Sequence, residues 1–172
     1  MKRVLIISAS PRKNGNSDIL CDRFAKGAAE SGHKVEKIFL ASENIGYCRG
    51  CGVCNSTHKC VQKDDMAEIL DKMVTADAIV LATPVYFYTM DGQMKTFIDR
   101  TVPRYTEITD KDFYFIMTAA DTEKGNLTRT MESVPRFYGG LSCRSERSGD
   151  YLRHWLLEGR RDKRHSGLQR SL

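Results

Sequence analysis

The sequence predicts an α/β protein built on a doubly wound parallel sheet. Short runs rich in β-branched residues alternate along the chain with segments whose apolar residues recur at helical spacing. Such alternation is typical of βαβ units, whose right-handed connections place the strands of one sheet parallel. Loops of small, polar and helix-breaking residues follow several of the strand-like runs. Because ligands of such sheets bind beyond the carboxyl ends of the strands, we expect these loops to form the site.

The individual elements follow from the length and spacing of the apolar residues. Strands are predicted at residues 3–8, 34–41, 77–87 and 111–120. Helices are predicted at residues 17–32, 64–76, 90–101 and from 126 to 131. Ser17 is the expected N-cap of the first helix and Gly32 its stop, and acidic residues suit the start of the second. The loops expected at the carboxyl edge are residues 8–17, 83–90 and 118–126.

Composition indicates a globular, cytoplasmic chain. A chain of 172 residues is long enough to bury a hydrophobic core. Its residues are 41% hydrophobic and 28% charged, which is typical of a globular protein. No apolar run approaches the roughly 18 residues of a membrane helix, so no membrane partner is expected. The apolar run near the N-terminus is too short for a signal peptide. In a reducing cytosol, clustered cysteines indicate metal, cluster or redox chemistry rather than disulfides.

The net charge of +5 is a property of one part of the chain. Residues 133–172 contain nine Lys and Arg against four Asp and Glu, whereas residues 1–132 contain eighteen of each. A nucleic-acid partner is therefore not expected for the main domain. A basic arm that binds nucleic acid or an acidic partner is the minor alternative for the tail.

The polar loop after the first strand predicts a phosphate site. Hydroxyls, amides and a helix N-terminus converge there, and such groups bind anions. The loop fits neither G-x-x-x-x-G-K-[ST] nor G-x-G-x-x-G, which disfavours nucleotide triphosphates and a dinucleotide fold. An ordinary polar turn with a helix cap is the alternative. The candidate ligands are Ser8, Ser10, Arg12, Asn14, Asn16 and Ser17.

Two segments, "SASPRKNGNS" and "ATPVYFYTMDGQMKTFIDR", resemble the flavodoxin-like NAD(P)H-dependent FMN reductases, and the resemblance covers roughly residues 1–131. It implies a flavodoxin-like sheet of parallel strands in the order 2-1-3-4-5 that binds FMN. It implies that the FMN phosphate is held by Ser10, Arg12, Asn16 and Ser17. It implies that the isoalloxazine ring is lined by Pro84, Val85, Tyr86 and Phe87, and bordered by Ala119, Ala120 and Asp121.

The aromatic segment "TPVYFYTM" supports the same site on chemical grounds. An apolar, aromatic strand end suits a flat heteroaromatic ring, and backbone N–H groups there can bond ring nitrogens. A role in the core or in an interface is the alternative for these aromatic residues. Hydride transfer through a flavin needs no Ser/His/Asp triad, and none is evident in the sequence.

Four of the six cysteines form the pattern C-x2-C-x2-C-x5-C. The short gaps let thiolates converge from a tight loop, and Gly50 and Gly52 allow the backbone to wrap a small object. The spacing favours a [4Fe–4S] cluster over the separated knuckles of zinc sites, although zinc and free or redox-active thiols stay open. Cys21 is expected to be buried and inert, and His58 to be a solvated loop residue. The candidate ligands are Cys48, Cys51, Cys54 and Cys60.

The spacing and position of this loop also resemble the compact cysteine motif of the iron-sulfur flavoproteins, a branch of the same superfamily. The resemblance implies a [4Fe–4S] cluster that passes electrons to FMN across a subunit interface. It also implies a homo-oligomer, either a dimer or a tetramer.

The family pattern stops near residue 132, which divides the chain into an FMN-binding domain, 1–132, and an aberrant basic tail, 133–172. The tail contains one lysine and eight arginines, whereas residues 1–132 contain eleven lysines and seven arginines. We attribute this shift to a change of reading frame. Codons that could encode residues 132–172 can, when read one base later, spell a helix, the strand-like run "GIIYGTGFW" and another helix. The expected fifth strand and last helix would then be lost or aberrant.

Together these patterns predict an FMN-dependent oxidoreductase. It would take a hydride from NADH or NADPH and pass electrons to a flavin, a quinone, an Fe–S cluster or a protein acceptor. The alternative is a flavodoxin-like electron carrier or metal-binding protein without NAD(P)H turnover. A third interpretation is a defective gene product that binds no FMN.

Overall fold

The computed structural model describes residues 1–120, 130 and 133. Its strands are β1 (Arg3–Ser8), β2 (Lys34–Phe39), β3 (Ala78–Tyr86), β4 (Thr89–Met90) and β5 (Asp112–Thr118). Its α-helices are α1 (Asn16–Glu30), α2 (Cys54–Thr57), α3 (Met66–Thr75) and α4 (Gly92–Asp99). Single 3₁₀ turns lie at Leu40–Ser42 and Tyr105–Glu107.

The main sheet is parallel, in the order β2-β1-β3-β5. Because β5 is the fourth strand expected from the sequence, this order confirms the flavodoxin-like prediction over the strands described. The two-residue strand β4 pairs antiparallel with the end of β3. The expected fifth strand and the helix from 126 to 131 lie outside the described residues, apart from Thr130.

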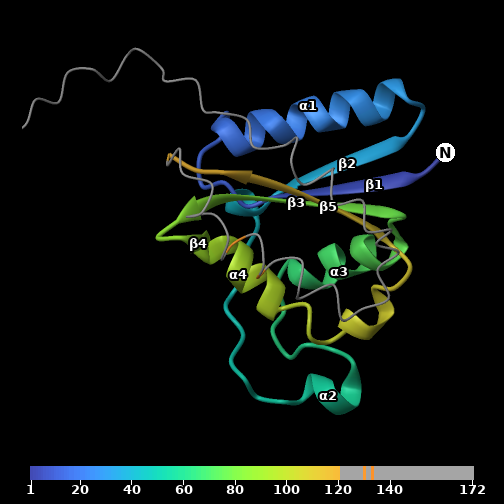
Figure 1. Cartoon of the computed structure of the whole chain (residues 1–172). Coiled ribbons are helices and arrows are strands. Elements are labelled where there is room, and N and C mark those ends of the chain that lie inside the picture. The colour runs from blue at the N-terminus through green and yellow to red at the C-terminus, as the bar shows by residue number, and fades with distance from the viewer. Residues whose placement is uncertain (121–129, 131–132, 134–172) are drawn as a thin grey trace, which may run out of the picture.

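Helices cover both faces of the sheet. Figure 1 shows α1 over one face and α3 and α4 over the other. Alternate residues of β1 point to opposite faces, as in any strand. Val4 and Ile6 belong to the core under α1, whereas Leu5 and Ile7 belong to the core against α3 and α4. This doubly wound arrangement fixes the strand ends from which the site loops emerge.

Most predicted elements are present, with shifted ends. The first strand has the expected bounds, and the strand predicted at 34–41 gives way to a 3₁₀ turn after Phe39. The N-cap prediction for Ser17 is wrong, because α1 begins at Asn16 and its N-cap is Gly15. α4 begins two positions later than expected, after an N-cap by Asp91, whose side chain accepts from the N–H of Met94. Of the helices described, none is long and apolar enough to span a membrane.

Candidate functional site

Three loops meet at the carboxyl edge of the sheet. The strand register pairs Ser8 of β1 with Ala82 of β3, and Pro84 of β3 with Thr118 of β5. The loops that follow these three strands therefore leave from adjacent positions. They are the phosphate loop (residues 8–17), the hairpin loop (residues 84–90) and the start of the loop after β5, at Ala119 and Ala120.

The phosphate loop is held in shape by its own hydrogen bonds. The hydroxyl of Ser10 donates to the carbonyl of Arg12 at 3.0 Å and accepts from the N–H of Arg12 at 3.2 Å. The N–H of Gly15 also donates to the carbonyl of Arg12, at 3.1 Å. A Cβ at Gly15 would lie 3.1 Å from that carbonyl oxygen, so a larger residue there would require the turn to shift by a few tenths of an ångström.

The buried carboxylate of Asp18 supports the phosphate loop from behind. It accepts from the N–H of Asn14 at 2.9 Å and from the hydroxyl of Ser8 at 3.3 Å, and Lys37 lies 2.7 Å away. Burial alone would raise the pKa of Asp18, but the hydrogen bonds and the charge of Lys37 outweigh it, and the pKa is lowered. Asp18 therefore stays ionised and fixes Asn14 in its left-handed conformation, φ 60°.

Ser17 joins the phosphate loop to the end of β5, which lies beyond β3 in the sheet. Its side chain is buried, and its hydroxyl lies 2.6 Å from the hydroxyl of Thr118 at the end of β5. The first-turn N–H groups of α1, those of Asn16, Ser17 and Asp18, have no intrahelical acceptors, because no turn precedes them. They leave the loop with donors for an anion, and the side chain of Arg12 in the same loop is exposed.

The hairpin loop carries backbone strain. Tyr86 pairs with Thr89, so Phe87 and Tyr88 form a two-residue turn, with φ values of 48° and 66°. Such turns prefer Asn-Gly, and large aromatic residues adopt positive φ at a cost of about 1–3 kcal/mol each. Phe87 is 97% exposed at the tip. Strain of this kind clusters at ligand-binding sites, which supports the prediction for this segment.

Hydrogen bonds between the buried residues Thr83 and Asp91 join the two ends of the hairpin loop, and we call this pair the clip. The hydroxyl of Thr83 donates to the carboxylate of Asp91 at 3.1 Å and accepts from the N–H of Asp91 at the same distance. Burial raises the pKa of Asp91, although hydrogen bonds from Met94 and Thr83 oppose the shift. The clip joins the end of β3 to the start of α4 and so fixes the position of Pro84, Val85, Tyr86 and Phe87.

The loop after β5 is described only in part. Ala119 is half-buried and Ala120 is exposed, beside the end of β3. Asp121, the third residue predicted at this border of the ring, lies outside the described residues.

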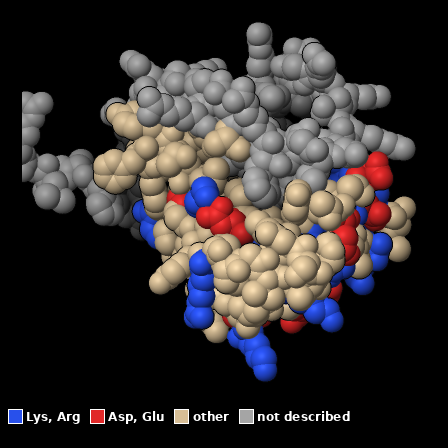
Figure 2. All heavy atoms as spheres, turned by 90° about the horizontal axis from the view of Figure 1, so that it is seen from below, with Lys and Arg blue, Asp and Glu red and all other residues tan. Residues whose placement is uncertain are grey.

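The cysteine loop (residues 47–60) extends away from the sheet with the short helix α2 at its tip, as Figure 1 shows. Cys48, Cys51, Cys54 and Cys60 line one small cavity of ≈ 30 Å³, together with Arg100 at the C-terminal end of α4. Among the described side chains, no three metal-binding residues lie close enough together to hold an ion. Gly50 and Gly52 have φ values of 64° and 72°, so the backbone does turn where expected. Figure 2, seen from below, shows uncharged residues over the middle of the described surface, with Lys, Arg, Asp and Glu around them.

The two remaining sequence expectations here concern Cys21 and His58. Cys21 of α1 is fully buried, as expected, and burial raises its thiol pKa to about 11, which suits an unreactive thiol. His58 is exposed at the end of α2.

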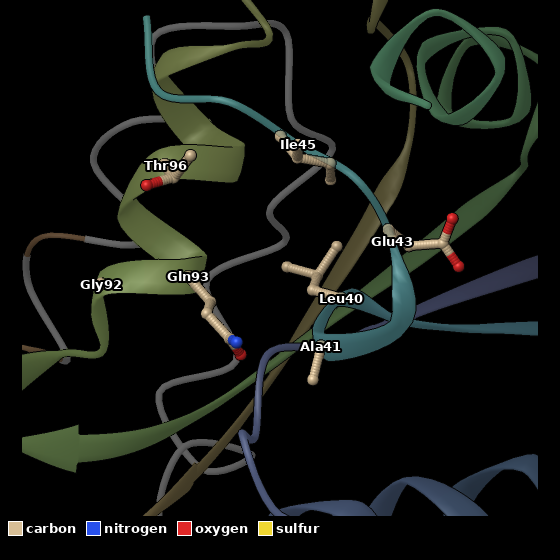
Figure 3. A pocket seen from close by; sticks show the side chains of 7 residues that line it. All are labelled: Leu40, Ala41, Glu43, Ile45, Gly92, Gln93 and Thr96. Atoms are coloured by element: carbon tan, nitrogen blue, oxygen red, sulfur yellow. The ribbon is translucent and has the colours of Figure 1, made fainter. Parts of the chain in front are cut away.

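A second cavity, of ≈ 210 Å³, lies between the segment after β2 and α4. In Figure 3 the side chain of Gln93 reaches toward Leu40 and Ala41, whereas Glu43 points away. The Oε1 atom of Gln93 is buried and has no hydrogen-bond partner among the described residues. This cavity was not foreseen, because it joins segments that are far apart in the sequence.

The parallel sheet, its helices on both faces and the loops at its carboxyl edge define a flavodoxin-like α/β domain. The chain belongs to the NADPH-dependent FMN reductase family, whose model matches residues 2–141. That match extends past the boundary expected at residue 132, which itself lies outside the described residues.

The similar proteins include iron-sulfur flavoproteins. One from Archaeoglobus fulgidus is 47% identical over 103 residues, which are 60% of this chain and 46% of the relative. One from Methanocaldococcus jannaschii is 42% identical over 101 residues, 59% of this chain and 52% of the relative. The chain spans about half the length of these relatives. An azoreductase structure from Bacillus anthracis shares the fold, with a TM-score of 0.68, 16% identity and 84% of each chain covered.

Proposed function

We propose that this chain binds FMN and acts as an FMN-dependent oxidoreductase that takes a hydride from NADH or NADPH. The observation that carries the proposal is the meeting of the phosphate loop, the hairpin loop and the end of β5 at one edge of the sheet. Membership of the FMN reductase family and likeness to iron-sulfur flavoproteins support it.

The phosphate loop would hold the phosphate of FMN. The free first-turn N–H groups of α1 and the guanidinium of Arg12 would donate to the phosphate oxygens. Ser10 and the side chain of Asn16 would also contact the phosphate. The loop would be held in shape by hydrogen bonds of Ser8, Asn14 and Ser17. Because the hydrogen bonds within the loop already exist, little ordering is required on binding.

The hairpin loop would hold the isoalloxazine ring. Pro84 and Val85 would present backbone groups to the ring edge, and Tyr86 and Phe87 would supply aromatic surface, while Ala119, Ala120 and Asp121 would border the other side. The flavin, when bound, supplies the capacity to accept a hydride and to give up electrons one or two at a time. The protein needs to position the nicotinamide against the ring, and the acceptor would be a flavin, a quinone, a cluster or a protein.

We also propose that the cysteine loop holds a [4Fe–4S] cluster. The four cysteines and Arg100 line one cavity, and the buried Nε atom of Arg100 is a donor without a partner among the described residues. Both features suit a sulfur-rich, negatively charged group. Since the cavity is small and the thiols have not converged, the loop must rearrange so that the four sulfurs surround the cluster. The cluster would supply one-electron transfer.

Exposed apolar side chains support a homo-oligomer, a dimer or a tetramer. Phe87 of the hairpin loop and Tyr47 of the cysteine loop are 97% and 77% exposed. A second copy of the chain would cover such side chains at low cost, since apolar burial favours association.

The described cysteines are all free thiols, which fits a reducing cytoplasm.

The test is anaerobic oxidation of NADH and NADPH by the purified chain with added FMN and a quinone. We expect FMN to bind, and nicotinamide oxidation to depend on bound FMN. If the chain binds FMN but does not oxidise NADH or NADPH, its function is the alternative one, that of an electron carrier. Absence of FMN binding would refute the proposal.

A further inference from the structure

Arg100 is the most deeply buried charged side chain near the cysteine loop. It is 2% exposed and lies directly after α4, at the helix end whose carbonyl groups favour a cation. A buried guanidinium is costly unless its donors are satisfied. The groups that accept hydrogen bonds from Arg100 therefore indicate its structural role.

The guanidinium binds both ends of the cysteine loop. One terminal nitrogen donates to the carbonyl of Gly46 before the loop and to Asp64 after it, both at 2.6 Å. The other donates to Asp64 at 2.8 Å. The carboxylate of Asp64 also accepts from the N–H of Gly46 at 3.2 Å, so the two chain ends and the arginine form one network. We call this network the neck of the loop.

The same guanidinium also reaches a cysteine. Its second terminal nitrogen lies 3.5 Å from the sulfur of Cys60, within hydrogen-bond distance for sulfur. Its Nε atom is buried and has no hydrogen-bond partner among the described residues, and Arg100 is one of the residues that line the cavity of the four cysteines. Only a planar guanidinium group, which has several N–H donors, can form hydrogen bonds to a carbonyl, a carboxylate and a sulfur at the same time.

We propose that Arg100 is a positioning residue for the cysteine site, which closes the neck of the loop and donates a hydrogen bond to the sulfur of Cys60. The second half of this role rests on the proposed [4Fe–4S] function. Hydrogen bonds to ligand sulfurs tune the reduction potential of such clusters. Because the donor stabilises the more negative, reduced state, Arg100 raises the potential.

The test compares Arg100→Lys with wild type and with Arg104→Lys. Lysine keeps the charge but lacks the fork, so it cannot serve every partner. Arg104 is the matched control, because it lies four positions further on and binds Glu107 and Asp71 away from the cysteines. The first measurement is hydrogen exchange of backbone amides 47–62 in the apoprotein, and the second is the potential of the reconstituted cluster.

For Arg100→Lys we expect exchange in the loop to accelerate at least about tenfold, since buried charged hydrogen bonds are lost. Exchange in β1 and β3 should stay unchanged, which shows that the variant folds. The potential should fall below that of wild type and of Arg104→Lys. Unchanged exchange would overturn the neck-closing role, and an unchanged potential would overturn the bond to Cys60.

Failure of the underlying function has a different signature. Wild-type protein that takes up no iron refutes the cluster, and with it the tuning of a potential by Arg100. The exchange measurement on apoprotein still decides whether Arg100 closes the neck.

Discussion

The phosphate loop and the cysteine loop differ in how far the chain builds each site without its ligand. The phosphate loop is short and internally bonded, and it rests on the buried carboxylate of Asp18. The cysteine loop is largely exposed and is tied to the body of the protein at its neck. Its thiols share a cavity but have not converged.

This difference shows where each site obtains its order. A phosphate can be bound by backbone N–H groups that a helix start already aligns, so the fold supplies most of the site. Thiolates repel one another and need a cation to converge, so a cysteine site is completed by the group it binds. We therefore expect FMN binding to depend on single contacts, and order in the cysteine loop to depend on iron.

The largest expected effect is loss of the cluster in Cys60→Ser. Iron and sulfide content after anaerobic reconstitution should fall to background, because a hydroxyl is a poor ligand for iron in such clusters. FMN binding should be retained, since the phosphate loop is separate. Cys21→Ala is the control, because Cys21 is buried on the inner side of α1, outside the cysteine loop, and should not affect iron content. Full iron content in Cys60→Ser would remove Cys60 from the ligand set.

The next effect concerns Arg12 in the phosphate loop. Arg12→Ala should weaken FMN binding about 10- to 100-fold, because one charge-assisted contact to the phosphate is lost. Titration of flavin fluorescence measures this, and riboflavin, which lacks the phosphate, should bind both proteins equally. The neighbouring Lys13→Ala is the matched control. Equal FMN affinity in Arg12→Ala and wild type would show that the phosphate lies elsewhere.

Asp18→Asn should destabilise the fold by about 1–2 kcal/mol at neutral pH, because a buried carboxylate with three donors is replaced by an amide. The folded-state pKa of Asp18 is lowered below the ordinary value of 3.8. Its contribution is therefore present above that value and is lost as the pH falls through the folded-state pKa. Urea unfolding should show a difference between variant and wild type that shrinks as the pH falls below 3.8.

The control for this experiment is Asp22→Asn, which removes an exposed partner of the same lysine and leaves Asp18 in place. A difference between Asp18→Asn and wild type that is constant with pH would contradict the ionised state of Asp18.

The smallest effect is expected in the hairpin loop. The double substitution Phe87→Asn, Tyr88→Gly supplies residues that suit the two positive φ values, so the apoprotein should gain about 1 kcal/mol of stability. Thermal unfolding measures the gain. FMN affinity should fall at the same time, because aromatic surface beside the ring is lost. If the variant is more stable but binds FMN with unchanged affinity, this turn does not contact the flavin.

The sequence predicts the parts of the site that are encoded locally. Ser8, Ser10 and Gly15 lie within one short segment, so their loop could be recognised, and the cysteine spacing is equally local. Arg100, Asp64 and Thr118 were missed, because their partners lie 36 to 101 positions away and only the fold brings them together. Strand β4 was missed because its turn, Phe-Tyr, lacks the Asn-Gly signal of such hairpins. The expected cap by Ser17 failed because its hydroxyl bonds to Thr118 instead.

We further propose that residues 133–172 form an aberrant basic tail that arose by a change of reading frame and contributes nothing to the flavin site. The coding DNA decides this. Its sequence read one base later should stay open and spell an apolar strand between two helices. A stop codon within this stretch of the shifted reading frame would contradict the proposal.

The central claim is that one chain builds a site for FMN and a second for an iron–sulfur cluster. The most direct test is the absorbance spectrum of protein purified without oxygen, supplied with FMN and passed through gel filtration. We predict two resolved flavin bands above a broad brown absorbance that dithionite bleaches. Flavin bands alone would contradict the cluster, and a spectrum without flavin would contradict the account of the fold's function.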